Sequence, residues 1–408
     1  MPKCEITANE DRKMDFSRTV LVTGGSGFIG SHLVSSLVTS HPDWRIINLD
    51  NLEYCCSSRS LESVENRANY TFIKGDVRDS QLVDHLFSTG SIDVIFHLAA
   101  QTHVEASFRS ASSFHRVNVD GTRVLLDAAH RAGHQPQRFI YVSTDEVYGG
   151  SLGEVFDESS PLRPTNPYAV SKVAAEYLVQ SYWDQYQFPV IITRSNNIYG
   201  PRQYTEKVIP RFLTLLLKNQ KCTIQGILPQ SRHFLFVSDA VNAFLLVLER
   251  GIVGEIYNVG TSFEIPIVQL ARELVKMVSL ESVIIKASQL VSVHEAVSGP
   301  VLGEEHSGLQ SERLAGVRAG EVRQEMATPP GNSLNLFVSC RPRVDLRYPI
   351  RCEKLQQLGW REQVPWAEGI KQTAQWYQDN PDFWSDVSDD QNIRSTFEKT
   401  SNKIPGPT

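Results

Sequence analysis

Short apolar runs rich in β-branched residues alternate with longer amphipathic stretches from residue 19 onward. A strand that is buried on both faces reads as a continuous apolar run, so these runs predict parallel strands. They cover residues 19–23, 45–50, 70–74, 94–98, 138–143 and 190–194. The amphipathic stretches predict helices at residues 29–39, 80–87, 117–132 and 168–186. This alternation predicts an α/β fold with a doubly wound parallel sheet, whose ligand lies beyond the carboxyl ends of the strands.

The alternation loosens after residue 199. Helices predicted at residues 208–217, 238–248 and 364–380, with a short strand at 255–259, indicate a smaller C-terminal lobe. We therefore assign a Rossmann-like domain to residues 18–199, completed by returning segments from the C-terminal half. A substrate-binding lobe is assigned to residues 200–380.

Three segments lack the periodicity of a folded element. Residues 1–17 are polar and charged, without the apolar centre of a signal peptide, which predicts a disordered lead-in. Residues 291–335 contain no Phe, Trp or Tyr and no sustained period, which predicts a disordered insert or linker. Residues 381–408 form a polar tail that we expect to fray.

Charge and composition narrow the classes of function. The net charge of −6 argues against a nucleic-acid groove or an anionic membrane surface as partner. No stretch approaches the roughly 20 apolar residues that cross a bilayer. The six cysteines include the adjacent pair Cys55-Cys56 but no repeated C-x-x-C spacing. We expect reduced thiols in a cytoplasmic protein, with neither a metal site nor disulfides.

A glycine-rich turn follows the first predicted strand. Gly24, Gly27 and Gly30 have the spacing that allows a tight turn, close approach to a pyrophosphate and close helix–strand packing. Asp50 ends the second strand about 20 residues later, where a carboxylate accepts from ribose hydroxyls and repels a 2′-phosphate. This context predicts NAD as the cofactor. A turn with a purely structural role, followed by a surface Asp, would show the same sequence pattern.

Other residues extend the predicted cofactor site. Phe28 and Ile29 belong to the turn that opens the first helix. Asp76, followed by Val77, comes after the third strand and could bind the adenine amino group, although an ordinary Asp turn explains it nearly as well. Small residues end the fourth strand and let a cofactor lie against the backbone, although they are also common in packed cores. They are Ala99 and Ala100.

The candidate catalytic group combines a base with two acids. Thr144, Asp145 and Glu146 directly follow the fifth strand, and Tyr168 and Lys172 lie one turn apart on the next helix. A nearby ammonium and the nicotinamide charge should lower the tyrosine pKa from about 10 toward neutrality. Burial beside Glu146 should raise the pKa of Asp145, so that it can act as an acid. Tyr-x-x-x-Lys alone could be a surface pair.

The chain resembles the extended short-chain dehydrogenase/reductase superfamily and, within it, the dTDP-glucose 4,6-dehydratases. The likeness covers residues 18–283 and 341–377. It rests on Gly24-x-x-Gly27-x-x-Gly30, His97-Leu98-Ala99-Ala100-Gln101-Thr102-His103-Val104, Ser143-Thr144-Asp145-Glu146-Val147-Tyr148-Gly149, Asn166-Pro167-Tyr168-Ala169-Val170-Ser171-Lys172, Asn197-Ile198-Tyr199-Gly200-Pro201, Glu206-Lys207-Val208-Ile209-Pro210 and Asp345-Leu346-Arg347-Tyr348. The Thr-Asp-Glu triplet is the specific part, because related epimerases and decarboxylases typically lack the acid pair.

The resemblance implies internal oxidation, elimination and reduction of a nucleotide sugar. Tyr168 would take the proton of the 4-hydroxyl group while NAD accepts the hydride from carbon 4, with Lys172 and Thr144 orienting the system. Glu146 would then remove the proton from carbon 5, and Asp145 would protonate the departing 6-hydroxyl group. The hydride would return to carbon 6. A 4-epimerase, a decarboxylase and a non-catalytic NAD-binding protein remain as alternatives.

The resemblance also implies substrate contacts and a dimer. Substrate-binding positions are Thr144, Asn197, Lys207, Arg232 and Arg347, of which the arginines suit a diphosphate. The family forms homodimers through a helical bundle, for which residues 117–132 and 168–186 are candidates, although such helices also pack on their own sheet. The chain departs from the family at residues 226–229, 340 and 344, so we expect any loss to fall on substrate affinity.

Overall fold

The computed structural model describes residues 15–53, 55–218, 220, 222, 224, 230–282 and 347–385. The predicted insert at residues 291–335 lies outside the described residues, as do almost all of the lead-in and most of the tail. The family departures at residues 226–229, 340 and 344 lie outside them as well.

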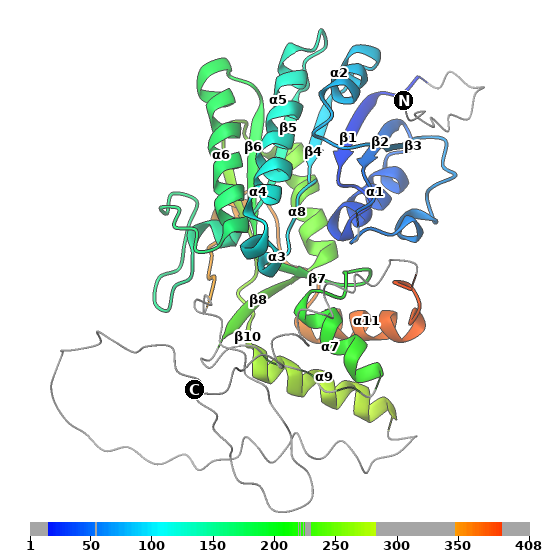
Figure 1. The fold of residues 1–408 in the computed structure, drawn as a ribbon, viewed down its shortest axis with the longest axis vertical. Coiled ribbons are helices and arrows are strands. Elements are labelled where there is room, and N and C mark those ends of the chain that lie inside the picture. The colour runs from blue at the N-terminus through cyan, green and yellow to red at the C-terminus, as the bar shows by residue number, and fades with distance from the viewer. Residues whose placement is uncertain are drawn as a thin grey trace, which may run out of the picture.

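A seven-stranded parallel sheet forms the centre of the larger part of the molecule (Figure 1). Its order is β3 (Tyr70–Lys74), β2 (Trp44–Asp50), β1 (Arg18–Thr23), β4 (Val94–His97), β5 (Arg138–Thr144), β6 (Val190–Ser195) and β9 (Ile256–Val259). The order reverses between β1 and β4, and such a switch point opens a crevice at the carboxyl ends of the strands. The predicted doubly wound fold is confirmed.

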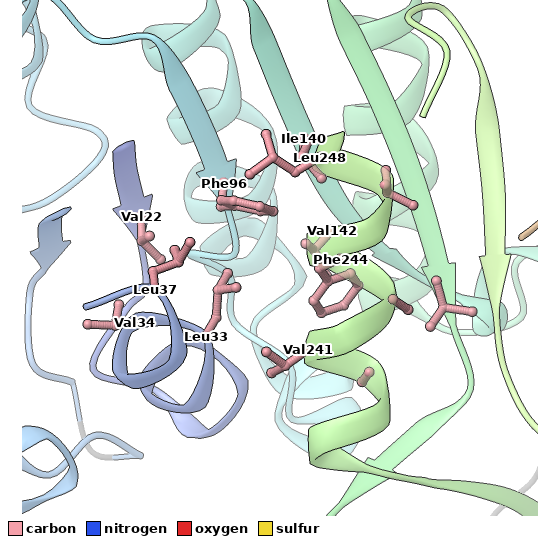
Figure 2. Packing of buried hydrophobic residues seen from close by; sticks show 14 of the residues in the cluster. Val22, Leu33, Val34, Leu37, Phe96, Ile140, Val142, Val241, Phe244 and Leu248 are labelled. Atoms are coloured by element: carbon pink, nitrogen blue, oxygen red, sulfur yellow. The ribbon is translucent and has the colours of Figure 1, made fainter. Parts of the chain in front are cut away.

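Helices cover both faces of this sheet. α1 (Phe28–Ser40) and α8 (Val237–Arg250) pack on one face, and α2 (Ser80–Thr89), α5 (Gly121–Arg131) and α6 (Pro167–Tyr186) pack on the other. Figure 2 shows Leu37 and Phe244 meeting the sheet residues Val22, Phe96 and Ile140. Burying each such side chain contributes about 1.5–3 kcal/mol. α8 and β9 thus return from the later part of the chain to the large sheet.

One predicted helix starts differently. The stretch expected over residues 117–132 begins as a π-helical turn, Arg116–Asp120, which leads into α5. Two short helices precede it, α3 (Val104–Arg109) and α4 (Ala111–His115). Within the π turn, the Asn118 amide bonds the Gln101 backbone at 2.8 and 3.0 Å and donates to the Ser171 hydroxyl at 2.9 Å. The turn therefore ties the end of β4 to α6.

A second, smaller unit lies below the large sheet in Figure 1. It contains a three-stranded sheet, ordered β10 (Glu264–Pro266), β8 (Ser231–Phe236) and β7 (Asn197–Tyr199). α7 (Val208–Leu217), α9 (Ile267–Ser282) and α11 (Trp366–Asp379) pack around it on a core of its own, whereas α10 (Glu353–Gln357) contacts β9. None of the helices in the described ranges is long and apolar enough to span a bilayer.

Candidate active site

A cleft opens at the carboxyl ends of β1, β4 and β5, and the glycine turn forms one wall of it. Gly24 has a φ of 72°, and a Cβ there would lie 2.7 Å from the Ala99 nitrogen. A Cβ on Gly30 would lie 2.1 Å from the Gly24 carbonyl oxygen. Only glycine fits both positions, because a side chain would collide with backbone atoms. These two glycines therefore allow the turn to pack closely against the segment after β4 and against the start of α1.

Helix α1 begins at this turn without a capping side chain. Its N-cap, Gly27, supplies no side-chain bond, and the first turn contains no acidic residue. The first backbone N–H groups of a helix have no intrahelical partners, and the helix dipole favours an anion there. Phe28 and Ile29 line the cleft beside these groups. The local structure suits the pyrophosphate of a dinucleotide.

Asp50 braces the glycine turn from the end of β2. Its carboxylate accepts hydrogen bonds from Ser26 N at 2.9 Å and from Leu52 N at 2.8 Å. Burial raises the pKa of Asp50, and the two backbone donors oppose that rise. Asp76 lies in the same cleft and makes a bidentate pair with Arg78, which lowers the pKa of Asp76. Both carboxylates thus face the cleft with partners from the protein.

The remaining predicted cofactor positions surround the same cleft. Val77, Ala99 and Ala100 line it, and so do Tyr168 and Lys172. Val77 also packs against Gly121 at the start of α5. A Cβ on Gly121 would lie only 2.7 Å from a Val77 methyl group, so the glycine lets α5 approach Val77 closely. Every residue that we predicted to bind the cofactor therefore borders one continuous cavity.

The acid pair follows β5 directly. Thr144 is the last residue of β5, and Asp145 and Glu146 open a short 3-10 helix, Asp145–Tyr148. The Thr144 hydroxyl donates to Asp145 Oδ1 at 3.2 Å and accepts from Glu146 N at 3.3 Å. Thr144 and Glu146 line the cleft, whereas the Asp145 side chain is buried behind it.

Helix α6 carries Tyr168 and Lys172 on a buried face. Asn166 caps the helix by accepting from Ala169 N at 2.8 Å, and Pro167 occupies the first helical position, where a missing N–H costs nothing. The Lys172 ammonium donates to the Val142 carbonyl oxygen at 2.7 Å and lies 4.3 Å from the centre of the Tyr141 ring. It is thereby held against the end of β5.

In the polypeptide alone, the pKa of Tyr168 departs from its ordinary value in the opposite direction to our prediction, which included the charge of a bound nicotinamide. Burial, followed by the negative charges of Glu146 and Asp145, raises the pKa of Tyr168 above its ordinary value, and the Thr144 hydroxyl only partly opposes this. Lys172 is not among the groups that lower it, and its ammonium donates to the Val142 carbonyl oxygen. Burial also lowers the pKa of Lys172 to about 7.

The prediction for Asp145 is confirmed. Burial raises the pKa of Asp145 to about 7, with a further contribution from Glu146. Asn196 and Thr144 donate hydrogen bonds that oppose the rise, and the positive charge of Arg232 opposes it as well. Asp145 therefore retains its proton close to neutral pH, as a general acid requires.

The predicted substrate residues divide into two groups. Asn197 and Lys207 line the cleft with Thr144, and Lys207 Nζ donates to the Thr102 carbonyl oxygen at 2.9 Å. Arg232 and Arg347 do not line it. Arg347 pairs with Glu264, with its Nη2 2.6 Å from Oε2, and the Arg232 guanidinium lies 5.1 Å from the Tyr348 ring centre. The Arg347 guanidinium is thus already paired with the Glu264 carboxylate.

Two cleft residues escaped the sequence-based prediction. Asn196 precedes Asn197, is 2% exposed and donates to Asp145 Oδ2 at 2.8 Å. Glu206 precedes Lys207, and its carboxylate lies 3.7 Å from His103 Nδ1. Both are adjacent to positions that we selected, and Glu206 lies within a motif that carried the resemblance. Their place directly before the predicted substrate residues Asn197 and Lys207 could have identified them from the sequence.

Comparison with known proteins gives a consistent result. The family model described as "NAD dependent epimerase/dehydratase family" matches residues 20–260. The chain is 50% identical over 372 residues to the dTDP-D-glucose 4,6-dehydratase of Homo sapiens, covering 91% of this chain and 93% of the human protein. It is 49% identical over the same length to the enzyme of that name from Bos taurus, covering 91% and 92% of the two chains.

The solved structures agree with the relatives. The crystal structure of DesIV, the dTDP-glucose 4,6-dehydratase from Streptomyces venezuelae with NAD bound, is 33% identical and superposes with a TM-score of 0.74. The match covers 91% of this chain and 100% of DesIV. The chain therefore belongs to the NAD dependent epimerase/dehydratase family and, within it, to the dTDP-glucose 4,6-dehydratases.

Proposed function

We propose that this protein is an NAD-dependent hydro-lyase that converts dTDP-glucose into dTDP-4-keto-6-deoxyglucose and water. The observation that carries the proposal is the placement of Asp145 and Glu146, an acid pair in one helical turn, beside Tyr168 at the end of β5. Simple oxidation of an alcohol needs one base. Two additional acid/base groups suit an elimination, and the relatives share this activity by name.

The residues of the cleft fit NAD. The backbone at Gly24, Gly27 and Gly30 would hold the pyrophosphate, and Asp50 would face the ribose, where a carboxylate disfavours the 2′-phosphate of NADP. Phe28, Ile29, Asp76, Val77, Ala99 and Ala100 would complete the site. When bound in its oxidised form, NAD supplies a reversible two-electron acceptor and a positive ring charge, which lowers the pKa of a phenol beside it.

The side chains of the protein then move the protons. Tyr168 takes the proton of the 4-hydroxyl group, Glu146 takes the proton from carbon 5, and Asp145 gives its proton to the departing 6-hydroxyl group. Lys172 and Thr144 position this group: Lys172 through the Val142 carbonyl, and Thr144 through Asp145 and Glu146.

The substrate would extend from the catalytic group toward the smaller unit. Thr144, Asn197 and Lys207 line the cleft and would contact the sugar and its phosphates. Arg232 on β8 and Arg347 do not line the cleft. We assign them to the diphosphate, because a guanidinium group suits phosphate oxygens. For Arg347 this role requires that the diphosphate compete with Glu264.

Product analysis tests this function. Purified protein with NAD should convert dTDP-glucose into its 4-keto-6-deoxy derivative, and UDP-glucose run in parallel tests the nucleobase. Tyr168→Phe should form no product, whereas Tyr177→Phe, a control on an exposed part of the same helix, should retain full activity. A galactose epimer would indicate a 4-epimerase, released carbon dioxide from a uronic acid substrate a decarboxylase, and bound NAD without turnover a non-catalytic protein.

We also propose that the protein acts as a cytoplasmic homodimer. Helix α6 exposes Val170 (51%) and Tyr177 (64%), and Phe108 on α3 is 56% exposed. Helix α3 contacts α6, and exposed apolar side chains that form one contiguous patch are typical of an interface. The four cysteines within the described ranges are free thiols, which suits a reducing compartment. Light scattering after size exclusion tests the dimer, and Tyr177→Glu should shift it to monomer.

A further inference from the structure

Asn196 is held by hydrogen bonds in one orientation. Its Nδ2 donates to Asp145 Oδ2 at 2.8 Å and to the Tyr348 carbonyl oxygen at 3.1 Å, while its Oδ1 accepts from Thr261 N at 3.1 Å. A flipped amide would place oxygen against the Tyr348 carbonyl and N–H against N–H. Both donors of the amide are therefore committed, and one of them always faces Asp145.

This clamp makes the two oxygens of Asp145 different. Oδ2 accepts from Asn196, so the titrating proton of Asp145 belongs on Oδ1. Oδ1 lies 3.2 Å from the Thr144 hydroxyl oxygen. The carboxyl group is only 2% exposed, so bulk water has little access to it. Its proton must be exchanged mainly through Thr144 or the substrate pocket.

Thr144 lies between the acid and the base. Its hydroxyl has one hydrogen, lies 3.2 Å from Asp145 Oδ1 and also interacts with the Tyr168 phenol, whose pKa it lowers. One lone pair accepts from Glu146 N. Since Thr144 can donate to only one of its two acidic neighbours, the other neighbour must donate to Thr144. When the pair Tyr168 and Asp145 carries a single proton, two arrangements result: protonated Tyr168 with ionised Asp145, or ionised Tyr168 with protonated Asp145.

The reaction starts from ionised Tyr168 with protonated Asp145 and ends with protonated Tyr168 and ionised Asp145. In one turnover Tyr168 gains the proton of the 4-hydroxyl group, and Asp145 loses a proton to the leaving water. Glu146 takes a proton from carbon 5 and returns it there. The finished cycle therefore leaves Tyr168 with one proton too many and Asp145 with one too few.

We propose that Thr144 returns the proton from Tyr168 to Asp145 after each turnover, and that Asn196 is the positioning residue that aims Asp145 at Thr144. This inference rests on the proposed function. The Tyr168 O–H bond breaks as Thr144 gains that hydrogen, and the original Thr144 O–H bond breaks as a bond to Asp145 Oδ1 forms. No electrons are exchanged, and the net charge of the group is unchanged.

The charges around Asp145 come from three elements. Glu146 lies on the same short helix, Tyr168 on α6, and Arg232 on β8. The substitutions below change none of these charged groups. A change in the behaviour of Asp145 can therefore be assigned to the hydrogen bonds of Asn196 and Thr144.

The test compares the first turnover with later ones in Asn196→Leu. Asp145 starts protonated below pH 7, so chemical quench with enzyme in excess should show a first turnover near the wild-type rate. Steady-state turnover should be at least about tenfold slower than the first, because a positioned proton-transfer group contributes roughly 10²–10⁴-fold. Imidazole buffer should raise the slow steady-state rate by supplying protons from solution.

A second pair keeps the test decisive if Asn196→Leu does not fold. Thr144→Val should show the same excess of first-turnover rate over steady-state rate, and Thr144→Ser, which keeps the hydroxyl, should restore the wild-type ratio. Asn69→Leu is the matched control, since Asn69 is buried and donates to two carbonyls far from the cleft. Its ratio should equal that of the wild type.

Equal slowing of first and later turnovers in both Asn196→Leu and Thr144→Val would overturn the proposal, because it would show a merely structural role. An imbalance that buffer acid does not relieve would overturn it too, since slow product release responds to no proton donor. If the wild type forms no product from dTDP-glucose, the proposed function itself fails, and this is established before any variant is measured.

Discussion

Asn166 and Glu146 are joined by a hydrogen bond of 2.8 Å from the amide Nδ2 to the carboxylate Oε2. The same amide accepts from Ala169 N through its Oδ1, so it also caps α6. One buried side chain thus fixes the proposed carbon-5 base to the start of the helix that carries Tyr168. Substitutions of Asn166 can separate its two roles, the cap of α6 and the hydrogen bond to Glu146.

Asn166→Ser should keep the cap and lose the bond to Glu146. We expect the stability to change little, while dehydration slows roughly ten- to hundredfold, since a hydrogen bond to a charged group contributes about 1.5–3 kcal/mol. Asn166→Ala should also lower the free energy of unfolding by about 0.5–2 kcal/mol, because the cap is lost. Urea denaturation and product formation measure the two effects. Unchanged dehydration in Asn166→Ser would refute the role of this bond.

Glu146→Gln should separate oxidation from elimination. The amide cannot take the proton from carbon 5, so loss of water should stop, while Tyr168 still serves the oxidation. Stopped-flow absorbance should therefore show reduced nicotinamide accumulating with dTDP-glucose, without product. Glu154→Gln, on an exposed loop, provides the control. Normal dehydration by Glu146→Gln would remove Glu146 from the role of base.

The pH dependence should report Asp145. Because its folded-state pKa is raised to about 7, the required protonated form predominates below pH 7 and is lost as the pH rises through that value. Dehydration should therefore fall by about tenfold per pH unit above the pKa. Asp145→Asn should be much slower and should lack this limb. A wild-type profile that stays flat from pH 6 to 9 would contradict the assignment.

A buried ion pair supports the site from behind. Arg194 Nη2 lies 2.6 Å from Glu176 Oε2, and Arg194 Nη1 donates to the Tyr148 hydroxyl at 2.8 Å, which links β6 and α6 to the acid-bearing turn. Arg194→Leu should lower the free energy of unfolding by about 3–5 kcal/mol, because Glu176 is left as an unpaired buried charge. Adding Glu176→Leu should restore much of the loss. A smaller stability in the double variant than in the single one would contradict this.

Periodicity predicted the large sheet well because its strands are buried on both faces and its helices are long. It missed β7, β8, β10 and α9, since β7 and β10 have only three residues each and the smaller unit depends on contacts between distant segments. The residue types of the catalytic group were readable from order and spacing. The pKa of Tyr168 was not, because its direction depends on how deeply the phenol is buried and how near Glu146 and Asp145 lie, which only the fold determines.

Asn196 shows a similar limit. A buried Asn between two strands reads as an ordinary polar residue, and only the coordinates place its amide against Asp145, Tyr348 and Thr261. Tyr348 and Thr261 are distant from it in the sequence, so no local pattern could predict the contact. The Thr-Asp-Glu motif identified Asp145 from the sequence, whereas its partner Asn196 is evident only in the folded structure.

The most direct test of the central claim follows one hydrogen of the sugar. dTDP-glucose carrying deuterium at carbon 4 should yield a 4-keto-6-deoxy product with that deuterium at carbon 6, because internal oxidation and reduction move it within one active site. Mass spectrometry and NMR of the product locate the label. Deuterium that remains at carbon 4 of a converted hexose such as the galactose epimer, or is absent from carbon 6 of the product, would contradict the account.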